Sequence, residues 1–173
     1  MDIISHGLWG SIAFGRRNRR SFWLSFFFGV APDLFSFGIF TATIWLGLAS
    51  GPDWGRGLPD PSSIPSYVHA LYDWTHSLFI FFLAFGLVWA IRHRPMWEMC
   101  GWGFHIVLDI FTHSTRFFPT PFLWPVSSVT HNGMPWSSPS IFIPNVTLLA
   151  LCYVWYFIVR VRRNHNVKKE NIL

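Results

Sequence analysis

Apolar residues in this chain occur in four long stretches, separated by short basic or Pro- and Gly-rich segments. A helix needs about 20 apolar residues to cross the roughly 30 Å hydrocarbon core of a membrane. The stretches 22–50, 67–91, 97–114 and 139–160 therefore predict four membrane spans. An earlier stretch, 2–15, is apolar but too short to cross, and we expect it to form a half-embedded or re-entrant helix.

Two of the predicted spans contain interruptions. Pro32 and Asp33 break the apolar run of the first span, which predicts a kink or tilt because proline removes a helical hydrogen bond. The span 97–114 is weaker, since it contains two glycines together with His105 and Asp109. The expected fold is all-α, a polytopic transmembrane helical bundle in which residues 1–173 form one integral membrane domain.

The composition supports a membrane protein over a soluble one. The chain is 51% hydrophobic, 20% aromatic and only 12% charged, whereas a soluble domain is about 25% charged. The net charge of +5 does not indicate nucleic-acid binding, because the positive residues occur in short runs beside apolar stretches. That distribution is typical of membrane-flanking anchors, so membrane lipids are the expected partners. Cys100 and Cys152 are far apart in apolar surroundings, and we interpret them as packing residues.

The basic residues also predict an orientation. If the four spans alternate in direction, all Lys and Arg residues except Arg56 and Arg116 fall on one side of the membrane. By the positive-inside rule, the 16–20 loop and the C-terminus are then cytoplasmic, and the loops 51–66 and 115–138 face outward. The chain is accordingly expected to be a multi-pass protein of a bacterial inner (cytoplasmic) membrane.

Ionisable side chains inside the predicted spans are candidates for function, because their burial in a membrane is costly. His105 and Asp109 are four residues apart and project from one helix face. His69, Asp73 and His76 are spaced to form a similar stripe. The other candidates are Asp33, His6 and His113.

Five of these groups are predicted to lie at a similar depth. At a rise of 1.5 Å per residue, each lies roughly 14 to 22 Å from the cytoplasmic end of its segment. Carboxylates in such a layer are costly unless they are neutralised, and a divalent cation can neutralise them while it binds imidazole nitrogens. Zinc suits His and Asp ligands best, with manganese or iron as alternatives. The predicted metal ligands are His6, Asp33, His76, His105 and Asp109.

The remaining candidates are assigned other roles. His69 and His113 are expected nearer the outer interface as polar surface groups, and His131 lies in a loop without an assigned role. Asp73 is expected to orient His76 through a carboxylate–imidazole hydrogen bond, as carboxylates often do for metal ligands. Any one of the buried groups can alternatively be a hydrogen-bonded packing residue between helices.

Short segments around these residues resemble a known family. They are Ser5-His6-Gly7, Ala31-Pro32-Asp33, Thr75-His76-Ser77-Leu78, His105-Ile106-Val107-Leu108-Asp109 with Thr112, and Pro121-Phe122-Leu123-Trp124-Pro125. As an ordered set they resemble the bacterial inner-membrane proteins known as LexA-regulated, membrane-bound metal-dependent hydrolases. The order is also more distantly similar to zinc-dependent phospholipase C, which implies hydrolysis of a phosphoester.

The chain departs from that family at two places. Leu34 and Phe35 stand where the family often has a further acidic residue or His, and Leu71 and Tyr72 replace a His-Arg pair. The resemblance therefore implies one metal and gives no support to a second metal or a phosphate-binding Arg.

Together these features predict a membrane-embedded metal-dependent hydrolase that acts on a lipid or phosphoester substrate. Asp33 is expected to be a ligand or the general base for a metal-activated water. Trp124 and Trp136 would line a lateral entrance or, more simply, belong to an aromatic belt at the membrane surface. The alternatives are a small transporter or ion channel that uses the same His and Asp residues, and a structural metal that only stabilises the bundle.

Overall fold

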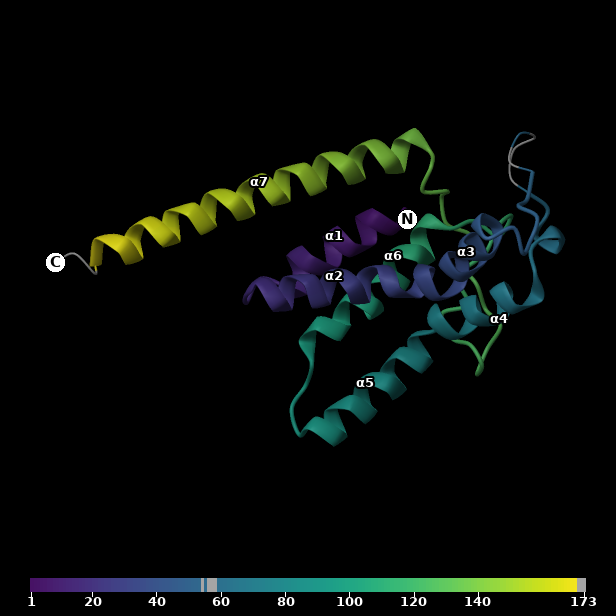
Figure 1. Cartoon of the computed structure of the whole chain (residues 1–173), viewed down its shortest axis with the longest axis horizontal. Helices are drawn as coiled ribbons and strands as arrows, with labels where there is room; N and C mark the ends of the chain where they lie inside the picture. The colour runs from purple at the N-terminus through teal and green to yellow at the C-terminus, as the bar shows by residue number, and fades with distance from the viewer. Residues whose placement is uncertain (54, 56–58, 171–173) are drawn as a thin grey trace.

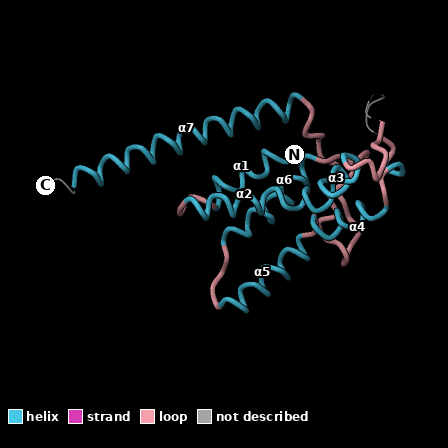
Figure 2. Tube along the Cα trace, viewed as in Figure 1, coloured by secondary structure: helices cyan, strands magenta, loops and turns pink. Residues whose placement is uncertain are grey.

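The computed structural model describes residues 1–53, 55 and 59–170, with side chains described as far as residue 160. Every regular element in this part of the chain is helical, as Figure 2 shows. The predicted all-α class is therefore confirmed. Two helices are long and apolar enough to cross a membrane, and a bent helix pair adds a third candidate.

Three helices pack closely and form the centre of the molecule (Figure 1): α1 (Ile3–Phe14), α2 (Arg19–Asp33) and α6 (Cys100–Thr112). Asp2 and Asn18 begin α1 and α2 by accepting hydrogen bonds from backbone N–H groups of the first turn. Glycines allow the backbones to approach. A Cβ added at Gly29 would lie 2.5 Å from the carbonyl oxygen of His6, and one at Gly101 would lie 2.7 Å from that of Ser25.

The first predicted span is present as a 27-residue apolar segment, Arg19–Trp45. It consists of α2, a π-helical turn η1 (Leu34–Gly38) and α3 (Ile39–Trp45), so it ends earlier than the predicted residue 50. The change in helical type follows Pro32, which cannot donate a backbone hydrogen bond. The Ser36 hydroxyl donates a hydrogen bond to the Pro32 carbonyl at 2.9 Å. Asp33 therefore lies where the regular α-helix ends.

The second predicted span, 67–91, is not one continuous helix. A short 3₁₀ turn, η2 (Pro61–Ser63), precedes α4 (Ser66–Thr75), and α5 (Leu78–Arg92) follows α4 at an angle of 58°. His69 and Asp73 lie within α4, and His76 is the cap at its C-terminal end, where its backbone N–H still donates to the Tyr72 carbonyl at 2.8 Å. Ser77 begins α5 by accepting a hydrogen bond from the backbone N–H of Ile80.

The region predicted as the third span, 97–114, forms a 3₁₀ turn η3 (Trp97–Met99) and the 13-residue helix α6. At 1.5 Å per residue, α6 is only about 20 Å long, so it is too short to cross a membrane by itself. The prediction of four full-length helical spans is corrected on this point. The short helix expected near the N-terminus is present as α1.

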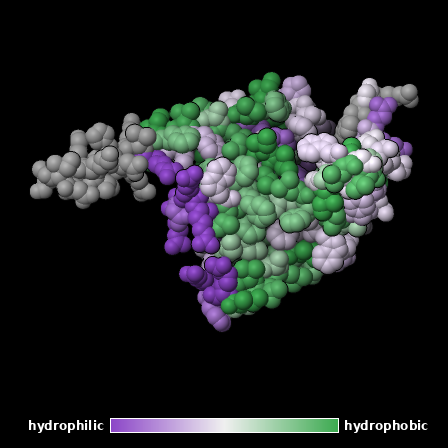
Figure 3. All heavy atoms as spheres, viewed as in Figure 1, coloured by the Kyte–Doolittle hydropathy of each residue, from purple (hydrophilic) through white to green (hydrophobic). Residues whose placement is uncertain are grey.

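The last helix, α7 (Pro139–Glu170), contains the apolar segment Pro139–Arg160, which matches the predicted fourth span. It lies along one side of the central helices (Figure 1), and only 11% of its most apolar window is buried. The turn between α1 and α2 and the C-terminal end of α5 lie towards the same end of the molecule (Figure 1), where hydrophilic atoms border an apolar surface (Figure 3). Arg160 of α7 lies beside Arg16 and Arg17 of that turn. These described basic residues are thus close together, in agreement with the charge pattern.

Candidate metal centre

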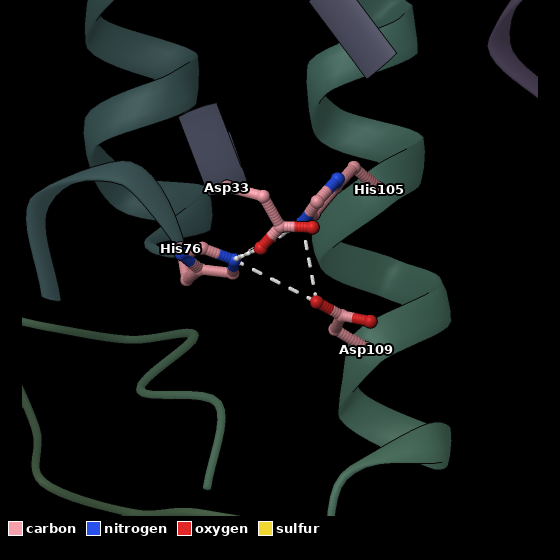
Figure 4. A group of neighbouring side chains, drawn as sticks. All are labelled: Asp33, His76, His105 and Asp109. Carbon is pink, nitrogen blue, oxygen red and sulfur yellow. Dashed lines mark hydrogen bonds and ion pairs between the residues drawn. The ribbon is translucent and has the colours of Figure 1, made fainter. Parts of the chain in front are cut away.

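Four of the five predicted ligands come together in one compact group, which we call the His–Asp cluster: Asp33, His76, His105 and Asp109. Each contributes one ligand atom, and these atoms all lie within 4.8 Å of one another. Asp33 ends α2, His76 lies in the break between α4 and α5, and the other two residues belong to α6 (Figure 4). Three separate parts of the chain therefore converge on one point.

The distances within the His–Asp cluster fit a small cation. His105 Nε2 is 3.0 Å from His76 Nε2 and 3.1 Å from Asp109 Oδ2. The remaining His–Asp separations run from 3.4 Å (His76 Nε2 to Asp33 Oδ1) to 3.9 Å (His105 Nε2 to Asp33 Oδ1). Ligands about 2.05 Å from a tetrahedral zinc ion are separated by roughly 3.3 Å. The observed separations bracket that value.

Hydrogen bonds to the Nδ1 atoms set the direction in which the two imidazoles present their lone pairs. His105 Nδ1 is 2.7 Å from the carbonyl oxygen of Gly29, and His76 Nδ1 is 3.2 Å from that of Tyr72. A carbonyl only accepts, so each Nδ1 carries a proton, and in the neutral form of each ring Nε2 presents a lone pair to the cluster. Two lone pairs 3.0 Å apart, beside two carboxylates, repel one another unless a cation lies between them. This arrangement is the usual one for metal-binding histidines.

His6, the fifth predicted ligand, lies against the cluster without belonging to it. Its Nε2 is 2.8 Å from Asp109 Oδ1, and its ring stacks on that of His105 with centroids 3.6 Å apart. His6 thus contacts the carboxylate oxygen that faces away from His105 and His76. It stabilises the negative charge of Asp109 from the α1 side.

His113, which the sequence analysis placed at the outer interface as a polar surface group, contacts Asp109 directly. It caps the C-terminal end of α6, and its Nδ1 lies 3.2 Å from Asp109 Oδ1. The amino group of Met1 and the hydroxyl of Thr112 also contact this oxygen. The spacing of four residues between Asp109 and His113 was the available signal, but the predicted depth of His113 placed it at the interface. Asp109 therefore joins two environments, with Oδ1 facing His6 and His113 and Oδ2 facing the cluster.

Asp73 lies outside the His–Asp cluster and does not have its predicted position beside the ring of His76. The partners of His76 Nδ1 are the Tyr72 carbonyl and, at 3.0 Å, the Thr75 hydroxyl. Both partners belong to α4 itself, and they contact the nitrogen that Asp73 was expected to contact. His69 contacts the Pro61 carbonyl at 3.1 Å and stacks on Phe118, in keeping with an interfacial position.

The segment 119–139 packs against the break that carries His76. The Leu78 backbone N–H donates to the Phe122 carbonyl at 2.9 Å, and the Ser77 hydroxyl donates to the Trp124 carbonyl. From α6, the Trp102 indole N–H donates to the Thr75 carbonyl at 2.6 Å. The break is therefore held by hydrogen bonds to distant parts of the chain, and these contacts place His76 in the cluster.

No family model, curated protein or solved structure matches this chain. Its relationship to known proteins therefore adds no residue roles to those given above. The geometry of the His–Asp cluster, within a chain that contains candidate membrane helices, is the basis for any functional conclusion.

Proposed function

We propose that this protein is a membrane-embedded metal-dependent hydrolase that acts on a lipid or phosphoester substrate. The observation that supports it best is the convergence of two imidazole Nε2 atoms and two carboxylates in an otherwise apolar helical molecule. Buried ionisable groups of this kind mark functional sites in membrane proteins. The resemblance of the segments around His6, His76 and His105 to membrane-bound metal-dependent hydrolases agrees with the proposal.

In the proposed topology the protein lies in a bacterial inner membrane with its basic end at the cytoplasmic surface. Four segments alternate in direction across the membrane in this topology: Arg19–Trp45, the bent pair α4–α5, α6 with its flanking turns, and α7. The short helix α1 is half-embedded and contributes His6 to the middle of the bundle. The C-terminus then lies on the cytoplasmic side.

Within the cluster, Asp33 has a position that differs from that of the other three residues. Its side chain is 17% exposed, whereas those of His76, His105 and Asp109 are fully buried. The three buried residues are therefore assigned to hold the metal, and Asp33 faces the side from which water and substrate arrive. Asp33 serves as the fourth ligand or as the base that accepts a proton from the attacking water.

His76, His105 and Asp109 would hold a divalent ion, for which their ligand set suits zinc best, and such an ion would supply Lewis acidity for the hydrolysis. The protein contributes the arrangement around it. His6 and His113 contact the outer oxygen of Asp109, and the carbonyls of Gly29 and Tyr72 fix the two imidazole rings. The lipid surroundings exclude bulk water, which strengthens every electrostatic contact in the site.

A transporter or ion channel is the alternative function for the same residues. Such a pathway requires polar groups at successive depths across the membrane. The ligand atoms of the cluster instead occupy a single compact volume, which favours a metal site over a ladder of groups. A metal that only stabilises the fold is the second alternative, and it differs from a catalytic one in the behaviour of Asp33.

Elemental analysis of the purified protein tests the first step. We expect about one equivalent of divalent metal per chain, retained by a His69→Ala control and lost from the double variant His76→Ala, His105→Ala. A wild-type protein purified without chelator and free of metal would contradict the proposal.

The Asp33→Asn variant tests the second step, with vesicles of bacterial phospholipid as substrate and released phosphate or headgroup as the readout. Metal retained together with a loss of hydrolysis supports catalysis by Asp33. Unchanged hydrolysis contradicts catalysis by Asp33, and a loss of thermal stability without any measurable wild-type hydrolysis supports a structural metal instead.

A further inference from the structure

A hollow lies at the basic end of the molecule, between α7 and the turn that joins α1 to α2. Its volume is about 510 Å³, within the range of small-molecule sites. Arg16, Arg17 and Asn18 line it from the turn, and Tyr156 and Arg160 line it from α7. The hollow therefore brings together cations from segments that are more than 130 residues apart in the sequence.

A second hollow of about 340 Å³ shares Tyr156 and Arg160 with the first. Arg19, Phe22 and Trp23 complete its lining from the first turns of α2. Arg160 is held in place between the two hollows, because its guanidinium lies 6.0 Å above the ring of Tyr156 and donates a hydrogen bond to the Tyr156 hydroxyl at 3.3 Å. The Tyr156 ring in turn stacks on Phe22.

The charge of these hollows favours an anion. Arg16, Arg17, Arg19 and Arg160 are all exposed, and none of the described residues that line either hollow is acidic. The carboxylate of Glu98 accepts a hydrogen bond from Ser21 nearby but does not line them. Guanidinium groups bind phosphate with particular strength, because their planar N–H groups match two phosphate oxygens at once.

The surface beside the hollows favours a lipid as the carrier of that phosphate. Apolar side chains are exposed on α7 immediately before Arg160, among them Trp155 and Phe157 at 55% and 57%, and Trp23 is exposed on α2 at 56%. Figure 3 shows hydrophilic atoms bordering an apolar surface at this end of the molecule. A ligand here meets positive charge at one end and an apolar surface along the rest of its length.

We propose that the two hollows form a binding site for the phosphate headgroup of an anionic glycerophospholipid, whose acyl chains lie along the exposed apolar faces of α7 and α2. Basic pockets at the cytoplasmic ends of membrane helices bind anionic headgroups in this way. The lipid bridges the α1–α2 turn and Arg160, so it strengthens the attachment of α7, a helix with little contact to the rest of the chain. This inference does not depend on the metal or on catalysis.

The test is a binding titration of the full-length protein in a neutral detergent, with phosphatidylglycerol or phosphatidylcholine as the added lipid. We expect saturable binding of phosphatidylglycerol and a higher unfolding temperature in its presence. The variant Arg17→Gln, Arg160→Gln should weaken that binding about 30-fold, at roughly fivefold for each charge removed. The matched control is Arg92→Gln, Arg94→Gln, which removes two charges from the end of α5 at the same side of the molecule.

Each other outcome overturns a defined part of the proposal. Equal binding of phosphatidylcholine contradicts a site for anionic lipid. Equal weakening by the control variant shows general attraction to negative charge instead of a site between α7 and the turn. Equal stabilisation by inorganic phosphate shows that the hollows bind a free anion and not a lipid. If the Arg17, Arg160 variant fails to fold, single Arg17→Lys and Arg160→Lys variants provide the comparison, since they keep the charge and lose the planar contact.

Discussion

The three central helices and α7 differ in which residue types they bury and which they expose. The helix α6 buries Gly101, Gly103, His105 and Asp109 together with Ile106, and it meets α1 and α2 through close backbone contacts. Over Pro139–Arg160, the part of α7 whose side chains are described, most residues are exposed, including large apolar side chains such as Leu151 and Phe157 at 61% and 57%. Polar and small residues thus hold the centre of this molecule, while apolar residues cover its outside.

The difference follows from the solvent that surrounds the helices. Lipid tails are as apolar as leucine, so burial of leucine between helices gains little free energy in a membrane. Helices associate there through close packing and hydrogen bonds, which small and polar residues provide. Even α7 follows this rule, because its buried Asn145 donates to the Ser5 hydroxyl at 2.9 Å and accepts from the Trp9 indole at 2.7 Å.

The largest effect is expected in the His–Asp cluster. The His105→Ala variant removes the imidazole that lies 3.1 Å from Asp109 Oδ2 and leaves that buried oxygen without this partner. We expect metal binding to be lost and the free energy of unfolding to fall by about 3 to 5 kcal/mol, measured by elemental analysis and by denaturant unfolding in detergent. The control His131→Ala, at an exposed position, should change neither. Full stability and full metal content in His105→Ala would falsify the assignment of this residue.

A pair of apolar truncations tests the comparison directly. Ile106 is fully buried in α6, and Leu151 on α7 is 61% exposed. Ile106→Ala leaves a cavity and should lower the free energy of unfolding by about 3 kcal/mol. Leu151→Ala should change it by less than about 0.5 kcal/mol, because lipid takes the place of the lost side chain. Similar losses in both variants would mean that α7 is packed against protein and not against lipid.

Close packing of the central helices makes Gly29 sensitive to a single added methyl group. The Cβ of Gly29→Ala would lie 2.5 Å from the His6 carbonyl oxygen, so α1 must move. We expect a loss of about 1 to 3 kcal/mol in unfolding free energy, with weaker metal binding because the Gly29 carbonyl orients His105. The control Gly86→Ala lies on α5 with open space around the added atom and should be neutral or slightly stabilising. An unchanged Gly29→Ala protein would show that α1 and α2 are not in close contact.

The smallest effect is expected at the polar contact that attaches α7. A double-mutant cycle of Asn145→Ala and Ser5→Ala should give a coupling free energy of about 0.6 to 2 kcal/mol, since interhelical hydrogen bonds in membranes are modest. Unfolding in detergent measures the four proteins of the cycle. Thr147→Ala, on the exposed part of α7, replaces Asn145→Ala in the control cycle and should give no coupling. Zero coupling between Asn145 and Ser5 would indicate that α7 is not attached at this point.

The sequence predicted the helical class, the two long apolar helices and all four residues of the His–Asp cluster. These predictions depend on residues that are close together in the sequence. Apolar length decides whether a helix suits a membrane. Asp33, His76, His105 and Asp109 were recognisable because ionisable groups in apolar stretches are rare and costly. The i, i+4 spacing of His105 and Asp109 survives because both lie within the single helix α6.

The break at His76 was not predicted, although the polar residues Thr75, His76 and Ser77 interrupt the apolar stretch there and Ser77 begins α5. The helix stops there because residues far away in the sequence form hydrogen bonds with the backbone and side chains of the break. The Trp102 indole donates to the Thr75 carbonyl, and the Ser77 hydroxyl donates to the Trp124 carbonyl. The position of His113 depends on similar contacts, since the Gly133 N–H donates to its carbonyl. Such contacts have no signature in the nearby sequence.

By itself the sequence determined which segments suit a membrane, which end of the molecule carries the basic residues, and which ionisable residues are costly enough to need partners. Those properties depend on the transfer free energies of individual residues, which add along the chain. Only the tertiary structure decided that α4 and α5 meet at a 58° bend and that α6 is too short to span alone. It also decided that one oxygen of Asp109 contacts His6 and His113 while the other contacts His76 and His105. Those properties depend on contacts between residues far apart in the sequence, and they exist only when the helices have packed together.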